Sequence, residues 1–314
     1  MVGAAEARSR AGLAFGLGAF GMWGLLPLYW DRLESAGAAE VIAHRMVWSL
    51  PTALVLLAFA GEWSWIRPLL RQPRRLALLA ASAVLIAVNW YLFIWAVGQD
   101  RVLEASLGYF INPLLTIAFG VLLLRERLRR AQWAAVGIGV LAVLVMTLAY
   151  GQVPWVSLAI SVSFGLYGLV KKQTGLDGLA GFSADSALQF LPALAFLVVL
   201  TARGDSTFTG EGAGHTALLV CSGLATALPL IFFGAAALRL PLATLGLMQY
   251  LTPVTMFLLG LLVFHEEMPP ERWAGFLLVW LALTVLTWDL LRQARRGRRA
   301  AAAGRTPAET THAG

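Results

Sequence analysis

Cysteine, histidine and charge are all scarce in this sequence. Cys221 is the only cysteine, so no disulfide framework can hold the fold together. The four histidines stand far apart, and none has a second histidine at the i, i+4 spacing of a helical zinc site. We therefore expect no metal and no cofactor. Only 13% of the residues are charged whereas 59% are hydrophobic, a balance that argues against a water-soluble globule.

Sequence signatures of several other protein classes are missing as well. The chain has no Gly-x-Ser-x-Gly elbow and no aspartate dyad, so we do not expect an enzyme. No glycine-rich phosphate loop is present that could couple ATP hydrolysis to the protein. The net charge is +7, but the basic residues are divided among short segments instead of sharing one face. Nucleic-acid binding is therefore not expected either.

Long apolar segments dominate the sequence instead. A bilayer-spanning helix needs ~20 mostly apolar residues, and the mean hydropathy of the chain is +0.74. The apolar runs, bounded by charges or by Gly and Pro clusters, predict an all-α, polytopic membrane protein with ten transmembrane helices in contact with the lipid bilayer. These spans are expected at residues 11–30, 40–60, 76–97, 105–124, 131–150, 154–170, 182–202, 215–237, 241–264 and 273–291.

The basic residues predict how the spans are oriented. Cytoplasmic segments of membrane proteins carry an excess of Lys and Arg, and most of the 24 Lys and Arg residues fall on one side when residues 1–10 are placed in the cytoplasm. We therefore predict that both termini are cytoplasmic, with a disordered basic tail at residues 292–314. The opposite side receives only Arg32, Arg101, Arg203 and Arg272.

The two halves of the chain resemble each other. Alignment of the chain with itself at an offset of about 140 residues matches Gly, Pro, Glu and Trp residues in order, which divides it into repeats at 11–150 and 154–291 with five spans each. The matches include Pro113 with Pro253, Gly120 with Gly260, Glu126 with Glu266 and Trp133 with Trp273.

An odd number of spans in each repeat has a topological consequence. The second repeat must enter the membrane from the side opposite to the first, so we predict two inverted five-helix repeats. The loop charges agree, because the basic segment 125–130 corresponds to the acidic segment 265–270. Two inverted halves can exchange conformations and open a central site to each side in turn, as secondary carriers do.

Charged residues inside a span are costly, so they usually face a cavity or a partner. His44 and Arg45 lie near the outer end of the second span, where Arg45 is either an arginine that snorkels to the interface or a cation that lines a substrate cavity. Asp185 occupies the position equivalent to His44, and one hypothesis pairs it with His44 or Arg45. Glu104 opens the fourth span, either as a helix-capping carboxylate or as a proton-titrating group. These four residues are the candidate charged or proton-coupling groups.

Two spans carry a proline at corresponding positions. Asn112–Pro113 is predicted to interrupt the fourth span, and residues 249–253 are predicted to interrupt the ninth. Paired breaks in the two halves of a carrier point to its binding region, although prolines also kink ordinary transmembrane helices. The predicted substrate-binding residues, near the bilayer midplane, are Asn89, Tyr109, Asn112, Gln249, Tyr250 and Thr252.

Several stretches are typical of a known family, and the most specific of them is residues 103–114, which read LEASLGYFINPL. They resemble the EamA family of the drug/metabolite transporter superfamily, and within it the RarD group, and the resemblance covers residues 10–290. Members commonly have glycine before the glutamate that closes the fourth and ninth spans, where this chain has Arg125 and His265. The other stretches that carry the resemblance are 44–49, 89–97, 167–172, 244–246 and 249–250.

This resemblance implies a bacterial cytoplasmic (inner) membrane permease of ten helices. Together with the inverted repeats, it predicts a secondary transporter that moves a small organic molecule, a drug or a metabolite, outward by alternating access and coupled to protons. The expected partners are therefore the lipid bilayer, a small-molecule substrate and protons. Two alternatives stay open. An intramembrane enzyme would turn over its substrate without translocating it, and a non-transporting membrane scaffold would show no substrate-dependent thermal shift.

Overall fold

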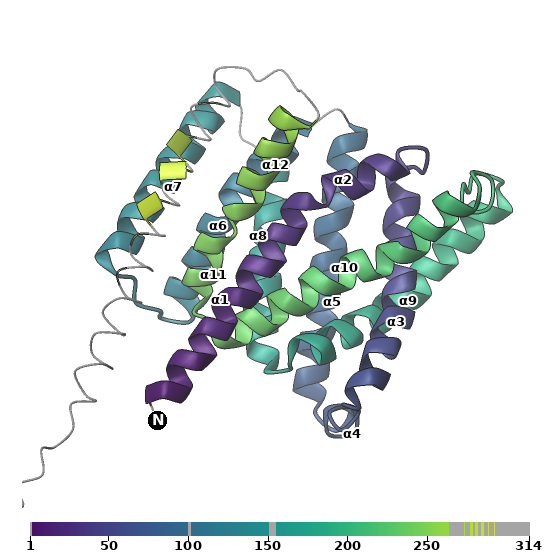
Figure 1. Cartoon of the computed structure of the whole chain (residues 1–314), viewed down its shortest axis with the longest axis horizontal. Coiled ribbons are helices and arrows are strands. Elements are labelled where there is room, and N and C mark those ends of the chain that lie inside the picture. The colour runs from purple at the N-terminus through teal and green to yellow at the C-terminus, as the bar shows by residue number, and fades with distance from the viewer. Residues whose placement is uncertain are drawn as a thin grey trace, which may run out of the picture.

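The computed structural model describes residues 2–99, 102–150 and 155–263, together with nine positions between 273 and 292. Every regular element in this part of the chain is helical (Figure 1). The elements are α1 (Val2–Leu25), α2 (Pro27–Trp30), the 3-10 turn η1 (Asp31–Leu33), α3 (Ala38–Ala60), α4 (Ile66–Leu70), α5 (Pro73–Gly98), α6 (Val102–Leu123), α7 (Arg130–Tyr150), α8 (Trp155–Thr174), α9 (Gly178–Ala202), α10 (Ala213–Arg239), α11 (Leu242–Met248) and α12 (Leu251–Leu262).

Helix length and composition identify a multi-pass membrane protein. Among the described residues, five helical segments are long and apolar enough to cross a bilayer, and α6 and α7 contain shorter apolar stretches. Large apolar side chains cover their outer surfaces, as at Phe59, Leu148 and Leu191, which are 88%, 79% and 70% exposed. A surface of this kind requires lipid and not water as its solvent.

The tenth predicted span, 273–291, lies largely outside the described residues. The described positions within it are helical, and three of them, Leu278, Trp280 and Val285, pack against a cluster formed by α6, α7, α11 and Tyr250. The tail at 293–314 and the acidic segment at 265–270 are not described, so the predictions for them stay predictions.

The central helix α8 is surrounded by other helices. It packs against α5, α6 and α10. Ser157, Ser161 and Ser163 are buried on it, and the Ser161 hydroxyl donates to the Gly108 carbonyl of α6 at 2.9 Å. Around its second half, aromatic rings from α1, α8 and α10 form the core. The ring centres of Trp23 and Phe233 each lie within 5.7 Å of the ring centre of Phe164.

Contacts along the helices give their relative directions. α1 runs parallel to α11 and α12, because Gly16 lies beside Met248, the Thr252 hydroxyl donates to the Phe20 carbonyl at 3.0 Å, and Gly24 lies beside Thr255. α6 runs parallel to α8, because Gly108 contacts Ser157 and Ser161 whereas Phe119, later on α6, contacts Gly165.

α11 and α6 are antiparallel and approach closely. Gln249, at the end of α11, bonds to Thr116, whereas Leu242, at its start, bonds to Glu126 beyond the end of α6. A Cβ atom added at Gly246 would lie 2.9 Å from the Pro113 carbonyl oxygen, so only glycine permits this crossing.

The segment after α6 caps a helix in the other half of the chain. The Glu126 carboxylate accepts hydrogen bonds from the backbone N–H groups of Leu242 and Ala243, both at 2.8 Å, and from Lys172 at 3.1 Å. The first two are amides at the N-terminus of α11 that lack partners within the helix. Arg125, just before this glutamate, has a φ of 55°, the left-handed conformation that favours glycine.

The two predicted helix breaks have different outcomes. In the ninth span, α11 ends at Met248 and α12 begins at Leu251, with Gln249 and Tyr250 forming a turn. The predicted interruption of the fourth span is wrong, since α6 continues through Asn112 and Pro113 to Leu123. A proline inside a transmembrane helix removes one hydrogen bond, and the helix can continue with a kink.

Candidate functional site

Arg45 projects from α3 into the interior of the helix bundle. Its Nε–H donates to Thr226 Oγ1 at 3.0 Å, and its guanidinium carbon lies 4.8 Å from the centre of the Trp30 ring and 4.5 Å from that of Trp90. Thr226 stands at the middle of α10, whose ends are Ala213 and Arg239. A snorkelling side chain would extend toward an end of the bundle, whereas this one reaches the middle of a spanning helix.

The surroundings of Arg45 are aromatic and lack a counter-charge. Arg45 is partly buried and forms no ion pair within the part of the chain that the structure describes. Tyr109 of α6 is close enough to interact electrostatically with the guanidinium, and its ring packs edge-on against Phe93 at 6.0 Å. We call Arg45, Trp30, Trp90, Tyr109 and Thr226 the arginine site.

A polar stripe on α6 continues from this site. Tyr109, Asn112 and Thr116 follow each other at i, i+3 and i+7, so they share one helical face. Asn112 is 9% exposed, and its Oδ1 atom is buried without a hydrogen-bond partner among the described residues. Thr116 accepts a hydrogen bond from the Gln249 amide at 3.1 Å. The stripe therefore brings together the predicted residues Tyr109, Asn112 and Gln249. Sequence reasoning missed Thr116, although its spacing of four from Asn112 could have indicated it.

The other predicted binding residues fasten helices to one another. The Asn89 amide donates to the Ile160 carbonyl at 2.7 Å and to the Ser163 hydroxyl at 3.1 Å, which joins α5 to α8. Thr252 donates to the Phe20 carbonyl and joins α12 to α1. Tyr250 is 1% exposed and packs against α7, where its hydroxyl covers Gly139. These three residues therefore lie in contacts between helices.

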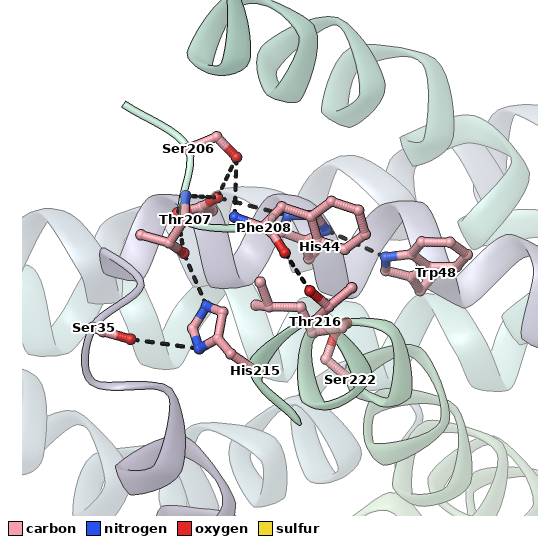
Figure 2. Close-up of polar contacts among 11 residues, drawn as sticks. Ser35, His44, Trp48, Ser206, Thr207, Phe208, His215, Thr216 and Ser222 are labelled. Atoms are coloured by element: carbon pink, nitrogen blue, oxygen red, sulfur yellow. Dashed lines mark hydrogen bonds and ion pairs between the residues drawn. The ribbon is translucent and has the colours of Figure 1, made fainter. Parts of the chain in front are cut away.

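A second polar cluster ties α3 to the loop between α9 and α10 (Figure 2). We call Glu40, His44, Ser206, Thr207 and His215 the loop cluster. The Glu40 carboxylate, 3% exposed, accepts from the Ser206 hydroxyl at 2.7 Å and from the backbone N–H and the hydroxyl of Thr207, both at 2.9 Å. Because the Thr207 hydroxyl donates its proton to Glu40, His215 Nε2, 2.9 Å away, must be a donor.

The hydrogen bonds of His44 also define its tautomer. Trp48 Nε1–H donates to His44 Nδ1 at 3.2 Å, so the proton of the neutral ring resides on Nε2, which faces Glu40 at 3.8 Å. The ring stacks on Phe208 with centres 4.7 Å apart (Figure 2). His44, Trp48, Ser206 and Phe208 also line a pocket of about 560 Å³ whose remaining walls are mainly apolar residues of α9.

A third cluster lies toward the other end of α9. We call Ser82, Lys171 and Asp185 the helix cluster, because they come from α5, α8 and α9. Lys171 Nζ is 2.6 Å from Asp185 Oδ2 and also donates to the Gly181 carbonyl at 2.8 Å, while Ser82 donates to Asp185 Oδ1 at 2.5 Å. Both charged side chains are at most 7% exposed. The pair is therefore a buried salt bridge with additional hydrogen bonds on both partners.

These contacts overturn the hypothesis that pairs Asp185 with His44 or Arg45. Asp185 is paired with Lys171, and the carboxylate beside His44 is Glu40. Sequence reasoning counted Lys171 among loop cations because α8 was expected to end at residue 170, whereas it continues to Thr174. Glu40 was missed too, although it stands one helical turn before His44.

Glu104 lies on α6, and its side chain is outside the part of the structure that is described. Within the described residues, no group of three or more His, Cys, Asp or Glu side chains lies close enough together to hold a metal ion. The arginine site and the polar stripe of α6 can offer a fixed cation, aromatic faces and one free carbonyl oxygen to a small molecule.

Comparisons with known proteins agree with this architecture. Residues 10–148 match the EamA-like transporter family. The chain is 58% identical to the protein RarD of Streptomyces exfoliatus over 94% of this chain and 93% of that protein. It is 43% identical to an uncharacterized transporter of Pseudomonas aeruginosa over 93% and 98% of the two chains. A solved crystal structure with 18% sequence identity has a TM-score of 0.67 and covers 90% of this chain and 98% of its own, which indicates a shared fold.

Proposed function

Because the chain belongs to the EamA-like transporter family and is a relative of the RarD proteins, we propose that it is a secondary transporter that exports a small organic molecule by alternating access between two inverted repeats. The repeats are α1 to α7 and α8 to the segment ending near residue 291. The membrane is the bacterial cytoplasmic membrane, with both chain ends in the cytoplasm, and the driving force is the proton gradient.

The observation that carries this proposal is the relative direction of α1 and α8, the first helices of the two halves. α1 is parallel to α11 and α12, α11 is antiparallel to α6, and α6 is parallel to α8. It follows that α1 and α8 run in opposite directions, as inverted repeats require.

The pattern of helix contacts also supports two equivalent halves. Each span of the first half has a counterpart five spans later in the second half. When both helices of an observed contact are replaced by their counterparts, the result is another observed contact. The contact pairs related in this way are α1–α10 with α5–α8, α1–α12 with α6–α8, and α3–α10 with α5–α9. The contacts α3–α9 and α6–α11 are their own counterparts, so they mark the axis about which the halves would rock.

Substrate would bind between these halves, on the arginine site and the polar stripe of α6. The loop cluster would close the outer end, because Glu40 ties α3 to the loop after α9. The helix cluster would close the cytoplasmic end, because Ser82 of α5 in the first half donates to Asp185 of α9 in the second half. Proton coupling would use carboxylates and histidines of this set, with His44, Asp185 and Glu104 as candidates.

Sided labelling of single cysteines tests the inversion. In a Cys221→Ser background, Gln72→Cys and Gly210→Cys place thiols in loops at equivalent positions of the two halves. A membrane-impermeant maleimide added to intact cells should label Gly210→Cys alone, and Gln72→Cys should react only after the cells are opened. Labelling of both variants from the same side would refute the inverted arrangement.

Transport itself can be measured without knowing the substrate. Proteoliposomes loaded with a bacterial extract of water-soluble metabolites should release one or more compounds faster than protein-free liposomes, as followed by mass spectrometry. An imposed pH gradient should accelerate that release. Release no faster than that from protein-free liposomes would contradict transport. Release at a rate that does not change with the pH gradient would contradict proton coupling.

A further inference from the structure

Arg45 differs from other interior cations of this protein because it has no carboxylate partner among the residues that the structure describes. Lys171 pairs with Asp185 at 2.6 Å, Lys172 with Glu126 at 3.1 Å, and Arg239 with Asp177 at 3.7 Å. Arg45 contacts Trp30, Trp90 and Thr226 instead, none of which carries a charge. An unneutralised cation at the middle of a membrane protein is expensive, so such residues usually serve a ligand or an ion pathway.

The free part of the guanidinium is its terminal fork. The Nε–H is engaged by Thr226, whereas the two Nη groups donate to no acceptor among the described residues. Arg45 as a whole residue is partly buried. The two indole rings and the hydrogen bond to Thr226 restrict the side chain, which reduces the entropy that a ligand must overcome. A planar fork of this kind matches the two oxygens of a carboxylate.

The polar stripe of α6 contains an acceptor that has no donor among the described residues. Asn112 Oδ1 is buried without a hydrogen-bond partner there, on the α6 face that Tyr109 shares. A buried acceptor left unpaired costs stability. A ligand that reaches it with an N–H or O–H group would remove that cost.

From this arrangement we infer that Arg45 is the anion receptor of the transport site, and that the substrate is a small organic carboxylate with an apolar body. The carboxylate binds the Nη fork, the apolar body lies among Trp30, Trp90 and Tyr109, and a donor group on the same molecule reaches Asn112. The inference rests on the proposed transport function, whose site it defines more closely.

Binding to the purified full-length protein in detergent tests the inference. The probes are sodium acetate, butyrate and benzoate, each compared with its neutral amide at constant pH and chloride concentration, with tryptophan fluorescence and thermal unfolding as readouts. We expect at least one carboxylate to bind saturably and its amide to bind not at all. Acids and amides that bind equally, or a panel in which no acid binds, would overturn the inference, as would a response to chloride alone.

Variants assign the binding to Arg45. Arg45→Gln should weaken binding of the carboxylate by roughly 10- to 100-fold, because a charge-assisted hydrogen bond is lost. Arg45→Lys keeps the charge without the fork and should bind with intermediate affinity, and it carries the test if the glutamine variant does not fold. Arg239→Gln is the matched control, since Arg239 also lies over an aromatic ring, Phe15, but has its own carboxylate. Unchanged affinity in both Arg45 variants would remove Arg45 from the site.

Transport of the bound probe distinguishes this inference from the proposed function. A carboxylate that binds through Arg45 but never crosses the membrane of a proteoliposome supports the receptor and contradicts the transporter. A compound that is transported equally well by wild type and by Arg45→Gln supports the transporter and contradicts the receptor.

Discussion

The loop cluster and the helix cluster occupy equivalent positions in the two halves but differ in chemistry. His44 and Asp185 are 141 residues apart, and Ser222 and Ser82 are 140 apart, close to the offset of the internal repeat. At the helix cluster, a buried ion pair joins two transmembrane helices directly. At the loop cluster, a carboxylate holds a loop through hydroxyl and backbone donors. Under the proposed repeat the two positions correspond, but the chemistry at the two ends differs.

The difference predicts how much stability each cluster loses when its carboxylate charge is removed. Loss of the Asp185 charge would leave Lys171 buried without a counter-ion, whereas loss of the Glu40 charge would leave neutral donors that water can satisfy. The helix cluster should therefore be the more sensitive of the two. The following variants test that ranking, from the largest expected effect to the smallest.

Removal of one charge from the helix cluster should cost the most. Asp185→Asn leaves Lys171 buried without a counter-ion and should lower the free energy of unfolding by about 3–5 kcal/mol, measured by thermal and denaturant unfolding in detergent. The double variant Lys171→Met with Asp185→Leu replaces both charges by apolar groups and should recover most of that loss. A double variant as unstable as Asp185→Asn would contradict the role of the unpaired charge.

The equivalent change at the loop cluster should have a smaller and more local effect. Glu40→Gln weakens the charge-assisted hydrogen bonds to Ser206 and Thr207 and should cost about 1–3 kcal/mol. Hydrogen exchange of the Thr207 amide and its neighbours should accelerate, while amides of α8 and the start of α9 keep their protection. Faster exchange in α8 as well would mean that the two closures are not independent.

The two serines at equivalent positions provide a matched pair. Ser82 donates to Asp185, whereas Ser222 donates to the Leu219 carbonyl of its own helix and does not reach His44. Ser82→Ala should therefore cost about 1–2 kcal/mol of stability, and Ser222→Ala about 0.5 kcal/mol or less. Equal losses in unfolding experiments would show that the clusters are more alike than their contacts indicate.

A change outside both clusters should stabilise the protein slightly. Arg125 has a left-handed backbone conformation, which costs an L-residue about 1 kcal/mol. Arg125→Gly should raise the unfolding temperature without altering either closure. A lower unfolding temperature would indicate that the Arg125 side chain contributes contacts worth more than the backbone strain.

The sequence predicts the positions of most helices well because apolar length and flanking charge are local properties. The second span, expected at 40–60, is α3 at Ala38–Ala60, and the seventh, expected at 182–202, is α9 at Gly178–Ala202. The first span was expected at 11–30, but α1 already begins at Val2. The early residues Ala4, Ala5 and Glu6 are good helix formers, and hydropathy alone does not register them.

The candidate site was harder to predict because its contacts join residues far apart in the chain. The polar residues within the predicted spans include Arg45, Asn112 and Gln249, but the sequence does not distinguish them from Asn89 and Thr252, which fasten helices. It also placed Lys171 in a loop, although the lysine is buried against Asp185. Which buried polar group bonds to which partner depends on helix packing, and a hydropathy pattern does not encode that packing.

Paired spin labels measure most directly whether the two ends of the site open in alternation. In a Cys221→Ser background, labels at Ala39 and Thr209 report on the loop end, and labels at Arg75 and Gln173 report on the helix end; all four positions are exposed. Pulsed electron spin resonance in lipid nanodiscs, at several values of pH and with benzoate, should find two populations in each pair. Conditions that lengthen one distance should shorten the other. Distances that lengthen together, or that keep a single value under every condition, would contradict alternating opening.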